Sequence, residues 1–282
     1  MSKESKKIVV ITGTTSGIGK ATAVEILKEG HTVIAPIRNP EKATVLQNET
    51  KQYPGKLEVL SCELTSMKSV RKAADEITKN HEKIDILINN AGGGIDKKTT
   101  TEEGIDASFA MNHLGHFLLT NLLLKSLQNA KTSKVINVSS ELHRFGNMDW
   151  ENVQFEKSYS GISAYNTNKF YNVLFTKAIA RKFSKEGIHS YSLHPGVVRT
   201  NISSGLNPFF QVMSKIGSIF MISPEDGAKT TLYLFRESEN NLENGGYYNE
   251  QKLAKNSSAA DDQKLQDQFW DYSLERVKKF LT

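Results

Sequence analysis

Residues 8–19 read Ile8-Val9-Val10-Ile11-Thr12-Gly13-Thr14-Thr15-Ser16-Gly17-Ile18-Gly19, an apolar run that ends in a glycine-rich turn. The apolar run is typical of a strand that is buried on both faces of a parallel sheet. Apolar residues at helical spacing follow the glycines, so the turn lies between a strand and a helix. Glycines let a backbone approach a pyrophosphate closely, and the free amides at a helix N-terminus attract its charge. The stretch predicts a dinucleotide-binding turn, although a tight turn without a ligand would use the same residue types.

Strands and helices alternate along the rest of the chain, with no internal repeat or dividing linker. Further strands are expected at 31–35, 57–60, 84–88, 134–138, 188–193 and 247–248, with helices starting at Pro40 and Tyr165 and spanning 66–79, 101–127, 224–235 and 261–281. Such repeats give right-handed parallel crossovers. Residues 1–282 are therefore predicted to form an α/β fold, a single-domain doubly wound parallel sheet (Rossmann fold) with helices on both faces and ligands at the carboxyl ends of its strands. Pro36 lacks an amide hydrogen, so the second strand is expected to end or bulge there.

Tyr165 and Lys169 lie at the start of a run of apolar residues with helical spacing. Four residues apart on a helix, a phenol and an ammonium share one face and can share a pocket. A nearby cation favours the phenolate, which would make the tyrosine a usable acid or base near neutral pH. Tyr248 and Lys252 have the same spacing without helical periodicity, so we interpret that pair as a chance match.

Composition excludes several other functions. The net charge of the 282 residues is +5, but basic and acidic residues are interleaved and no basic run marks a nucleic-acid footprint. The single cysteine, Cys62, excludes an internal disulfide and fits a reducing compartment, where we expect it to be a small buried hydrophobe. The short polar N-terminus and the absence of an apolar run near the ~18 residues of a transmembrane helix predict a cytoplasmic protein without a transmembrane anchor. His113 and His116 have helical spacing, but no partner ligand is evident, so no metal site is predicted.

The glycine spacing Gly13-x-x-x-Gly17-x-Gly19, followed after the fourth strand by Asn89-Asn90-Ala91-Gly92, resembles the short-chain dehydrogenase/reductase family. The resemblance covers nearly the whole chain through Met111-Asn112-His113-Leu114-Gly115-His116, Val138-Ser139-Ser140, the pair Tyr165 and Lys169, and His194-Pro195-Gly196-Val197-Val198-Arg199-Thr200. Residues 112–120, 172–176 and 194–200 are similar to the retinol dehydrogenase branch and its WW-domain oxidoreductase relatives, as is the wide gap between the serine and the tyrosine. That branch often has an N-terminal membrane anchor, for which this sequence shows no apolar segment. Glu63 stands where the family usually has an aspartate near the adenine.

The resemblance implies hydride transfer between a nicotinamide cofactor and a carbonyl or alcohol, with Asn112, Ser140, Tyr165 and Lys169 as the catalytic residues. Tyr165 would be the general acid or base, and Lys169 would lower its pKa and bind the nicotinamide ribose. Ser140 would hydrogen-bond the substrate oxygen, and Asn112 would hold a water that links Lys169 to solvent. Alternatively, Ser139 and Ser140 are only polar residues at a strand end, or Ser139 rather than Ser140 takes the serine position. Separately, Asn112 could only satisfy the backbone of a kinked helix. The implied cofactor-binding residues are Gly13, Thr15, Ser16, Gly17, Ile18, Gly19, Arg38, Glu63, Leu64, Asn90, Ala91, Gly92, Tyr165, Lys169, Pro195, Gly196, Val198 and Thr200.

The end of the second strand bears on the choice of cofactor. An acidic residue there would bind the adenosine ribose and exclude a 2′-phosphate. This chain has Ile37-Arg38-Asn39 instead, which offers no acid and a guanidinium suited to a phosphate. The sequence therefore favours NADP(H) over NAD(H), unless Arg38 is an ordinary surface cation.

Two apolar-rich stretches, 141–164 and 201–223, are expected to shape the substrate pocket. The first holds Phe145, Met148, Trp150 and Phe155, and the second could be a lipophilic lid, a patch that touches a membrane surface, or core. We predict a hydrophobic small-molecule substrate such as a retinoid, steroid or lipid aldehyde or ketone. The alternative function is a cofactor-binding sensor or scaffold with little turnover. Homo-oligomers are common in the family, and helix 261–281 could cap the monomer or block association.

Overall fold

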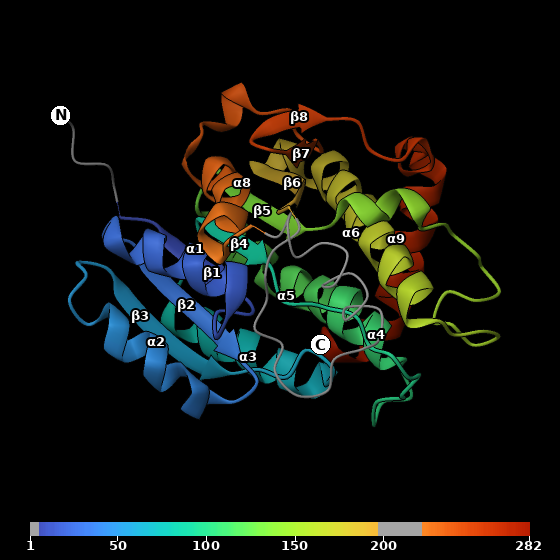
Figure 1. The fold of residues 1–282 in the computed structure, drawn as a ribbon, viewed down its shortest axis with the longest axis horizontal. Coiled ribbons are helices and arrows are strands. Elements are labelled where there is room, and N and C mark those ends of the chain that lie inside the picture. The colour runs from blue at the N-terminus through green and yellow to red at the C-terminus, as the bar shows by residue number, and fades with distance from the viewer. Residues whose placement is uncertain (1–5, 197–221) are drawn as a thin grey trace.

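Eight strands form one sheet in the computed structural model, which describes residues 6–196 and 222–282 (Figure 1). They are β1 (Ile8–Ile11), β2 (Thr32–Ile37), β3 (Lys56–Ser61), β4 (Ile86–Asn89), β5 (Ser133–Val138), β6 (Ile188–His194), β7 (Tyr247–Asn249) and β8 (Lys252–Ala254). Their order is β3-β2-β1-β4-β5-β6-β7-β8, and every pair is parallel except β7 with β8. The strand order reverses direction between β1 and β4, which is where a doubly wound sheet binds its ligand.

Helices cover both faces of this sheet. They are α1 (Gly17–Lys28), α2 (Ala43–Thr50), α3 (Met67–Asn80), α4 (Ala107–Phe109), α5 (Gly115–Asn129), α6 (Gly161–Phe183), α8 (Pro224–Arg236) and α9 (Gln263–Val277). Val9 and Ile11 of β1 pack with residues of α1 and α8, whereas Val10 packs with residues of α3, α5, α6 and α9. Neighbouring residues of a strand point to opposite faces, so the continuous apolar run of β1 contributes to both layers. The predicted doubly wound α/β fold is confirmed.

The second strand continues through Pro36, contrary to the expectation that it ends or bulges there. Pro36 pairs with Leu60 of β3, and the main-chain oxygen of Ile37 accepts a hydrogen bond from the amide of Cys62 at 2.9 Å. Alternate residues of β2 face β3, which leaves Pro36 facing β1. The pairing of β2 with β1 stops at Ile34, so the missing amide hydrogen breaks no ladder bond.

The long helix expected over 101–127 begins later and changes character within its length. Asp106 caps its start by accepting a hydrogen bond from the amide of Phe109 at 2.9 Å. A wide π-helical turn, η2 (Ala110–Leu114), then separates α4 from α5. Because a π-turn inserts an extra residue, it reorients the side chains that follow it, and such turns occur often at functional sites.

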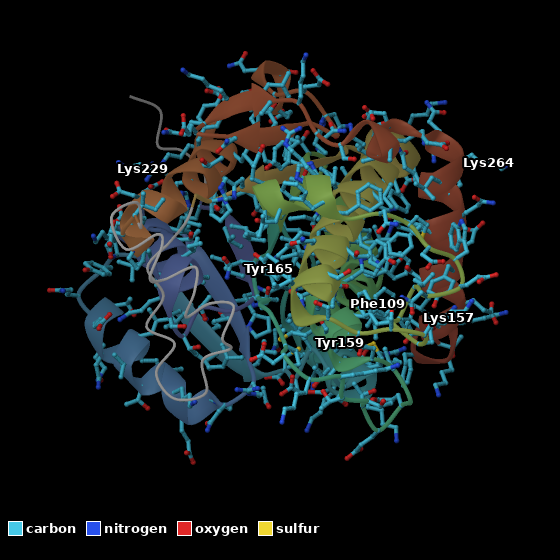
Figure 2. The ribbon with its side chains drawn as sticks, turned by 45° about the vertical axis from the view of Figure 1, so that its right-hand side comes forward. Phe109, Lys157, Tyr159, Tyr165, Lys229 and Lys264 are labelled. Atoms are coloured by element: carbon cyan, nitrogen blue, oxygen red, sulfur yellow. The ribbon has the colours of Figure 1, made fainter. Side chains whose placement is uncertain are left out.

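The C-terminal part of the chain contains one strand that the sequence pattern did not reveal. β8 pairs with β7 in a hairpin that holds Tyr248 and Lys252, which confirms that this pair does not lie on a helix. Helix α9 then lies beside α6 (Figure 2) and packs its aromatic residues against α4 and α6. Phe269 lies 4.4 Å from Tyr171 and 6.5 Å from Phe109 between ring centroids. The end of the chain thus covers α5 and α6 rather than extending the sheet.

Candidate active site

A cavity of about 400 Å³ opens where β1, β2 and β4 end. Many of the predicted cofactor-binding residues line it: Gly13, Thr15, Ser16, Gly17, Ile18, Gly19, Arg38, Glu63, Leu64, Asn90, Ala91 and Gly92. Six other residues complete the lining: Pro36, Ile37, Asn39, Lys42, Cys62 and Met111. The carboxyl ends of parallel strands and a glycine-rich turn therefore meet at one hollow, as a dinucleotide site requires.

The glycine turn has the geometry that a pyrophosphate needs. Gly13 and Gly17 have φ values of 75° and 57°, in the left-handed region that other residues rarely adopt. Ser16, which precedes α1, makes no side-chain hydrogen bond to the helix, so its first amides remain open to an anion. Asn90 fastens the turn by donating its side-chain amide to the oxygen of Thr12 at 2.8 Å. These residues fit a dinucleotide cofactor.

Gly19→Ala tests this turn. A Cβ at Gly19 would lie 2.2 Å from the oxygen of Gly13 and 2.3 Å from Nδ2 of Asn90, so the whole turn would have to shift. We expect the Kd for NADPH to rise at least about tenfold, which corresponds to about 1.4 kcal/mol of lost binding, and the Tm to fall. Fluorescence titration and thermal unfolding measure both. Gly93→Ala is the control, since its Cβ would meet nothing within 4 Å. Equal behaviour of the two variants would contradict the argument.

Ser140 and Tyr165 lie together at the end of β5. Ser139 is engaged elsewhere, because its hydroxyl donates to the oxygen of Lys169 at 2.7 Å. The hydroxyl of Ser140 accepts a hydrogen bond from the amide of Leu142 at 3.2 Å and is hydrogen-bonded to the phenol of Tyr165. The structure therefore brings Ser140, and not Ser139, to the tyrosine.

Lys169 lies one helical turn after Tyr165 and is almost fully buried. Its Nζ is 5.5 Å from the centroid of the Tyr165 ring and donates to the oxygen of Val138 at 2.9 Å. An ammonium carries three donors, so two more are available to a bound molecule. A Cβ at Gly92, which lines the cavity, would lie 3.5 Å from this Nζ, and this places Lys169 directly behind the cavity wall.

Asn112 lies in the π-helical turn η2 and is fully buried. Its amide nitrogen donates to the oxygens of Ser108 and Gly93, at 2.9 Å and 3.0 Å, and its oxygen accepts from the amide of Gly93 at 2.9 Å. Satisfying a distorted helix, the alternative drawn from the sequence, is thus part of what this side chain does. It also ties the helix to the loop that follows β4, beside Lys169.

The expectation that Lys169 lowers the pKa of Tyr165 is not met. The surrounding protein raises the pKa of the phenol by desolvating the phenolate, and the hydrogen bond with Ser140 offsets this only in part. Burial also lowers the pKa of Lys169 to about 8. Its ammonium donates to the oxygen of Val138, and the shift of the tyrosine pKa follows from burial and from Ser140.

A charged cluster lies at the end of the cavity where β2 and β3 stop. Arg38, whose side chain is 75% exposed, has its Nε 3.7 Å from Oε2 of Glu63. The other oxygen of Glu63 accepts from the amide of Thr65 at 3.2 Å. Lys42, which the sequence reasoning missed, lines the same cavity four residues after Arg38. The helix start expected at Pro40 lies two residues before Lys42 and was the signal that could have drawn attention to this lysine.

The remaining predicted residues lie after β6, in the stretch 141–164, or outside the part of the chain that the structure describes. Pro195 and Gly196 directly follow β6, and Val198, Thr200 and all but the last two residues of 201–223 lie outside the described residues. The side chains of the stretch 141–164 divide: Phe145 and Trp150 are exposed, Met148 is partly buried and Phe155 is buried in the core. Phe155 is therefore a packing residue.

His113 and His116 point to different partners. Nε2 of His113 lies 2.9 Å from the hydroxyl of Ser273, and Nε2 of His116 lies 2.9 Å from the hydroxyl of Thr12. Burial lowers the pKa of each imidazole to about 3, so both are neutral. Within residues 6–196 and 222–282, no group of three or more His, Cys, Asp or Glu side chains could hold a metal ion, and no helix is both long and apolar enough to cross a bilayer.

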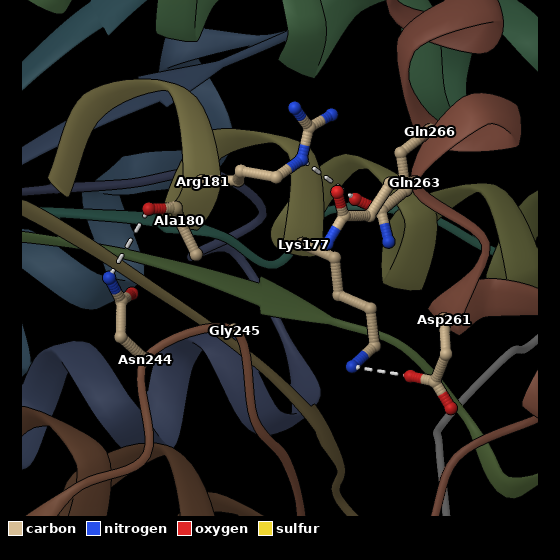
Figure 3. Close-up of a pocket in the computed structure, with 8 residues that line it drawn as sticks. All are labelled: Lys177, Ala180, Arg181, Asn244, Gly245, Asp261, Gln263 and Gln266. Atoms are coloured by element: carbon tan, nitrogen blue, oxygen red, sulfur yellow. Dashed lines mark hydrogen bonds and ion pairs between the residues drawn. The ribbon is translucent and has the colours of Figure 1, made fainter.

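A second hollow, of about 270 Å³, lies between α6, the loop before β7 and the segment that leads into α9 (Figure 3). Each of its cations already faces a carboxylate: Lys177 is 2.9 Å from Asp261, and Arg181 is 2.5 Å from Asp267. Arg181 also donates to Gln266, and the side chain of Asn244 donates to the oxygen of Ala180. We interpret the polar contacts around this hollow as structural contacts that hold α9 against α6.

Comparison with known proteins identifies the class to which this fold and site belong. The family model of short chain dehydrogenases matches residues 7–209, and the chain belongs to that family of nicotinamide-dependent oxidoreductases. Its curated relatives include human retinol dehydrogenase 14, 35% identical over 95% of this chain and 85% of the relative, and mouse retinol dehydrogenase 13, 36% identical over 96% and 84%. These similarities confirm the resemblance to the retinol dehydrogenase branch.

Solved structures agree on the fold. An uncharacterized protein from Mycobacterium paratuberculosis is 29% identical with a TM-score of 0.80, over 97% of this chain and 94% of that one. A 3-ketoacyl-(acyl-carrier-protein) reductase from Brucella melitensis, solved with NADH, is 22% identical with a TM-score of 0.67, over 86% and 96%. The second similarity is one of fold alone.

Proposed function

We propose that the chain is an NADP(H)-dependent oxidoreductase that interconverts a hydrophobic alcohol and its carbonyl, such as a retinoid, steroid or lipid aldehyde or ketone. One observation carries the proposal: Gly92 lines the same cavity as the glycine turn, and a Cβ there would lie 2.6 Å from Oδ1 of Asn112 and 3.5 Å from Nζ of Lys169. The ring of Tyr165, whose phenol is hydrogen-bonded to Ser140, lies 5.5 Å from that Nζ. A bound dinucleotide would thus end beside an acid, a hydroxyl and a buried cation.

The proposed chemistry divides among these side chains. The nicotinamide cofactor supplies or accepts the hydride when it is bound. Ser140 donates a hydrogen bond to the substrate oxygen, and Tyr165 gives its phenolic proton to that oxygen during reduction or removes it during oxidation. Because the pKa of Tyr165 is raised, the phenol is protonated at neutral pH. This state suits reduction of a carbonyl.

Arg38→Gln tests the cofactor preference. A guanidinium binds a phosphate through charge-assisted hydrogen bonds, so its loss should remove about 1.5–3 kcal/mol from NADPH binding alone. We expect the KM for NADPH to rise about 10- to 100-fold while the KM for NADH changes less than about twofold. Lys42→Gln should act in the same direction. Lys51→Gln, an exposed lysine at the end of α2, is the control. A wild-type preference for NADH would overturn the proposal of NADP(H).

The hydrophobic nature of the substrate is inferred from exposed apolar side chains on the two elements that hold Ser140 and Tyr165. Ile162, in the first turn of α6, and Phe145, at the end of the turn after Ser140, are both exposed apolar side chains. Apolar side chains around a few polar groups are typical of lipophilic pockets. The relatives named above are retinol dehydrogenases. Oxidation of NADPH by a panel of aliphatic, retinoid and steroid carbonyls tests this substrate class, with short polar aldehydes as the comparison. NADPH binding without turnover of any of them would favour the sensor or scaffold instead.

Location and assembly stay predictions. The reducing, cytoplasmic compartment rests on the single cysteine, Cys62, which is free and buried. Association would have to use a surface other than the parts of α5 and α6 that α9 covers. Size-exclusion chromatography with light scattering tests the oligomeric state directly.

A further inference from the structure

The position of Ser140 depends on the short turn that follows it, η3 (Glu141–Phe145). Ser140 is the residue that caps this turn, and its hydroxyl accepts from the amide of Leu142 within it. The turn rests against α6, since a Cβ at Gly146 would lie 2.5 Å from the oxygen of Asn166. Whatever holds η3 in place therefore also sets where the Ser140 hydroxyl meets Tyr165.

His143, in the middle of η3, is fully buried and bridges two backbone groups. Its Nδ1 lies 2.7 Å from the oxygen of Ser140, and its Nε2 lies 3.0 Å from the amide nitrogen of Ser257. A carbonyl oxygen can only accept and an amide can only donate. Both contacts are satisfied together only by a neutral imidazole with its proton on Nδ1.

Two neighbours of His143 in the turn reach the same C-terminal segment. The carboxylate of Glu141 accepts from the phenol of Tyr247 at 2.7 Å, and the guanidinium of Arg144 donates to the oxygen of Lys255 at 2.5 Å. The rings of His143 and Tyr247 lie 4.5 Å apart between centroids. Three side chains of one turn thus bind residues more than a hundred positions later in the chain.

We infer that His143 is a positioning residue: its neutral imidazole couples the backbone of Ser140 to Ser257, and so holds the Ser140 hydroxyl against Tyr165. The inference rests on the proposed role of Ser140 in the reaction. It gives the segment 247–257 a part in catalysis without contact between that segment and the reacting atoms. Displacing a catalytic group by about 1 Å is enough to slow a reaction about 100-fold.

Three substitutions separate the two contacts of the imidazole. His143→Phe keeps a ring against Tyr247 and removes both hydrogen bonds. His143→Asn keeps a donor near the position of Nδ1, for Ser140, and His143→Gln keeps an acceptor near the position of Nε2, for Ser257. His31→Asn is the matched control, because His31 is also a buried histidine that accepts a backbone hydrogen bond, from Lys7, but it lies at the amino end of β2.

We expect kcat for carbonyl reduction to fall about 10- to 100-fold in His143→Phe, with the KM and Kd for NADPH within about twofold of wild type. His143→Asn should recover more of kcat than His143→Gln, since it retains the contact with Ser140. His31→Asn should lower the Tm without this change in kcat. A kcat of His143→Phe equal to that of wild type, or a loss of kcat in His31→Asn of the same size, would overturn the positioning role.

Hydrogen–deuterium exchange tests the coupling without turnover. In His143→Phe, amides of both 140–146 and 255–258 should exchange faster, whereas those of the glycine turn should not change. Unaltered exchange in either segment would overturn the coupling, even if the wild-type enzyme turned over no carbonyl in the panel. A wild-type protein without turnover but with coupled exchange would refute the proposed function and leave the link between the two segments established.

Discussion

Tyr165→Phe should abolish turnover while it leaves NADPH binding intact. General acid–base catalysis typically contributes 10²- to 10⁴-fold, so we expect kcat to fall by about 10³-fold or more. The phenylalanine ring fills the same space, and the loss is confined to the phenolic oxygen that Ser140 contacts. Steady-state NADPH oxidation with the best carbonyl of the panel measures kcat, and fluorescence titration measures the Kd for NADPH.

Tyr171→Phe is the matched control for this substitution. Tyr171 lies on the same helix, α6, but its fully buried ring faces the aromatic residues of α9, and its hydroxyl contacts the oxygen of Val153 at 3.3 Å. Its loss should lower stability by about 1 kcal/mol, the value of an ordinary hydrogen bond, with kcat unchanged. If Tyr165→Phe kept more than about a tenth of the wild-type kcat, another group would have to be the acid.

The fold could be predicted because its decisive signals are local. The apolar run before Gly13 and the strand–helix alternation after it depend only on neighbouring residues, and they indicate a parallel sheet with right-handed crossovers. Pro36 shows where local reasoning stops. Its missing amide hydrogen would break the strand only if β1 extended far enough to pair with Pro36. How far β1 extends is a property of the assembled sheet.

The candidate site was predictable in its residues and less so in its electrostatics. The spacing of Tyr165 and Lys169 correctly placed both on one side of α6. It could not reveal that the ammonium donates to the oxygen of Val138, or that burial raises the pKa of the tyrosine. His143 is invisible to the same reasoning because its partner, Ser257, is distant in sequence and offers only a backbone amide.

Lys169→Met should remove activity without lowering stability. Loss of the ammonium deprives the proposed site of its buried cation and of two donors for a bound ribose, so we expect kcat/KM to fall at least about 100-fold. Methionine retains the apolar stem. The oxygen of Val138 also keeps a donor, since the side-chain amide of Asn172 lies 3.3 Å from it. Kinetics with NADPH and thermal unfolding measure the two effects.

The stability of this variant follows from the pKa of Lys169, which burial lowers from 10.5 to about 8. At about 1.4 kcal/mol per pKa unit, keeping this ammonium buried at pH 7 costs about 3 kcal/mol. Between pH 8 and 10.5 the unfolded chain holds a proton on this group that the folded chain has released, so the contribution of Lys169 to the unfolding free energy of wild type should rise with pH across that window. In Lys169→Met this rise should be smaller, and the Tm at pH 7 should equal or exceed that of wild type.

Lys134→Met should give the opposite result, although burial lowers the pKa of Lys134 to about 8 as well. Its Nζ donates to the main-chain oxygens of Leu234, at 2.9 Å, and of Phe235, which lie in the last turn of α8. It also donates to the main-chain oxygen of Glu237, the residue that follows the helix. Removing these donors leaves buried carbonyls unsatisfied, at a cost of about 1–3 kcal/mol each, so the Tm should fall while kcat is retained. The two lysines thus have similarly lowered pKa values but different partners. Lys134 binds the carbonyls at the end of α8, whereas Lys169 lies behind the wall of the cavity. Loss of stability in Lys169→Met equal to that in Lys134→Met would show that Lys169 too has a mainly structural role.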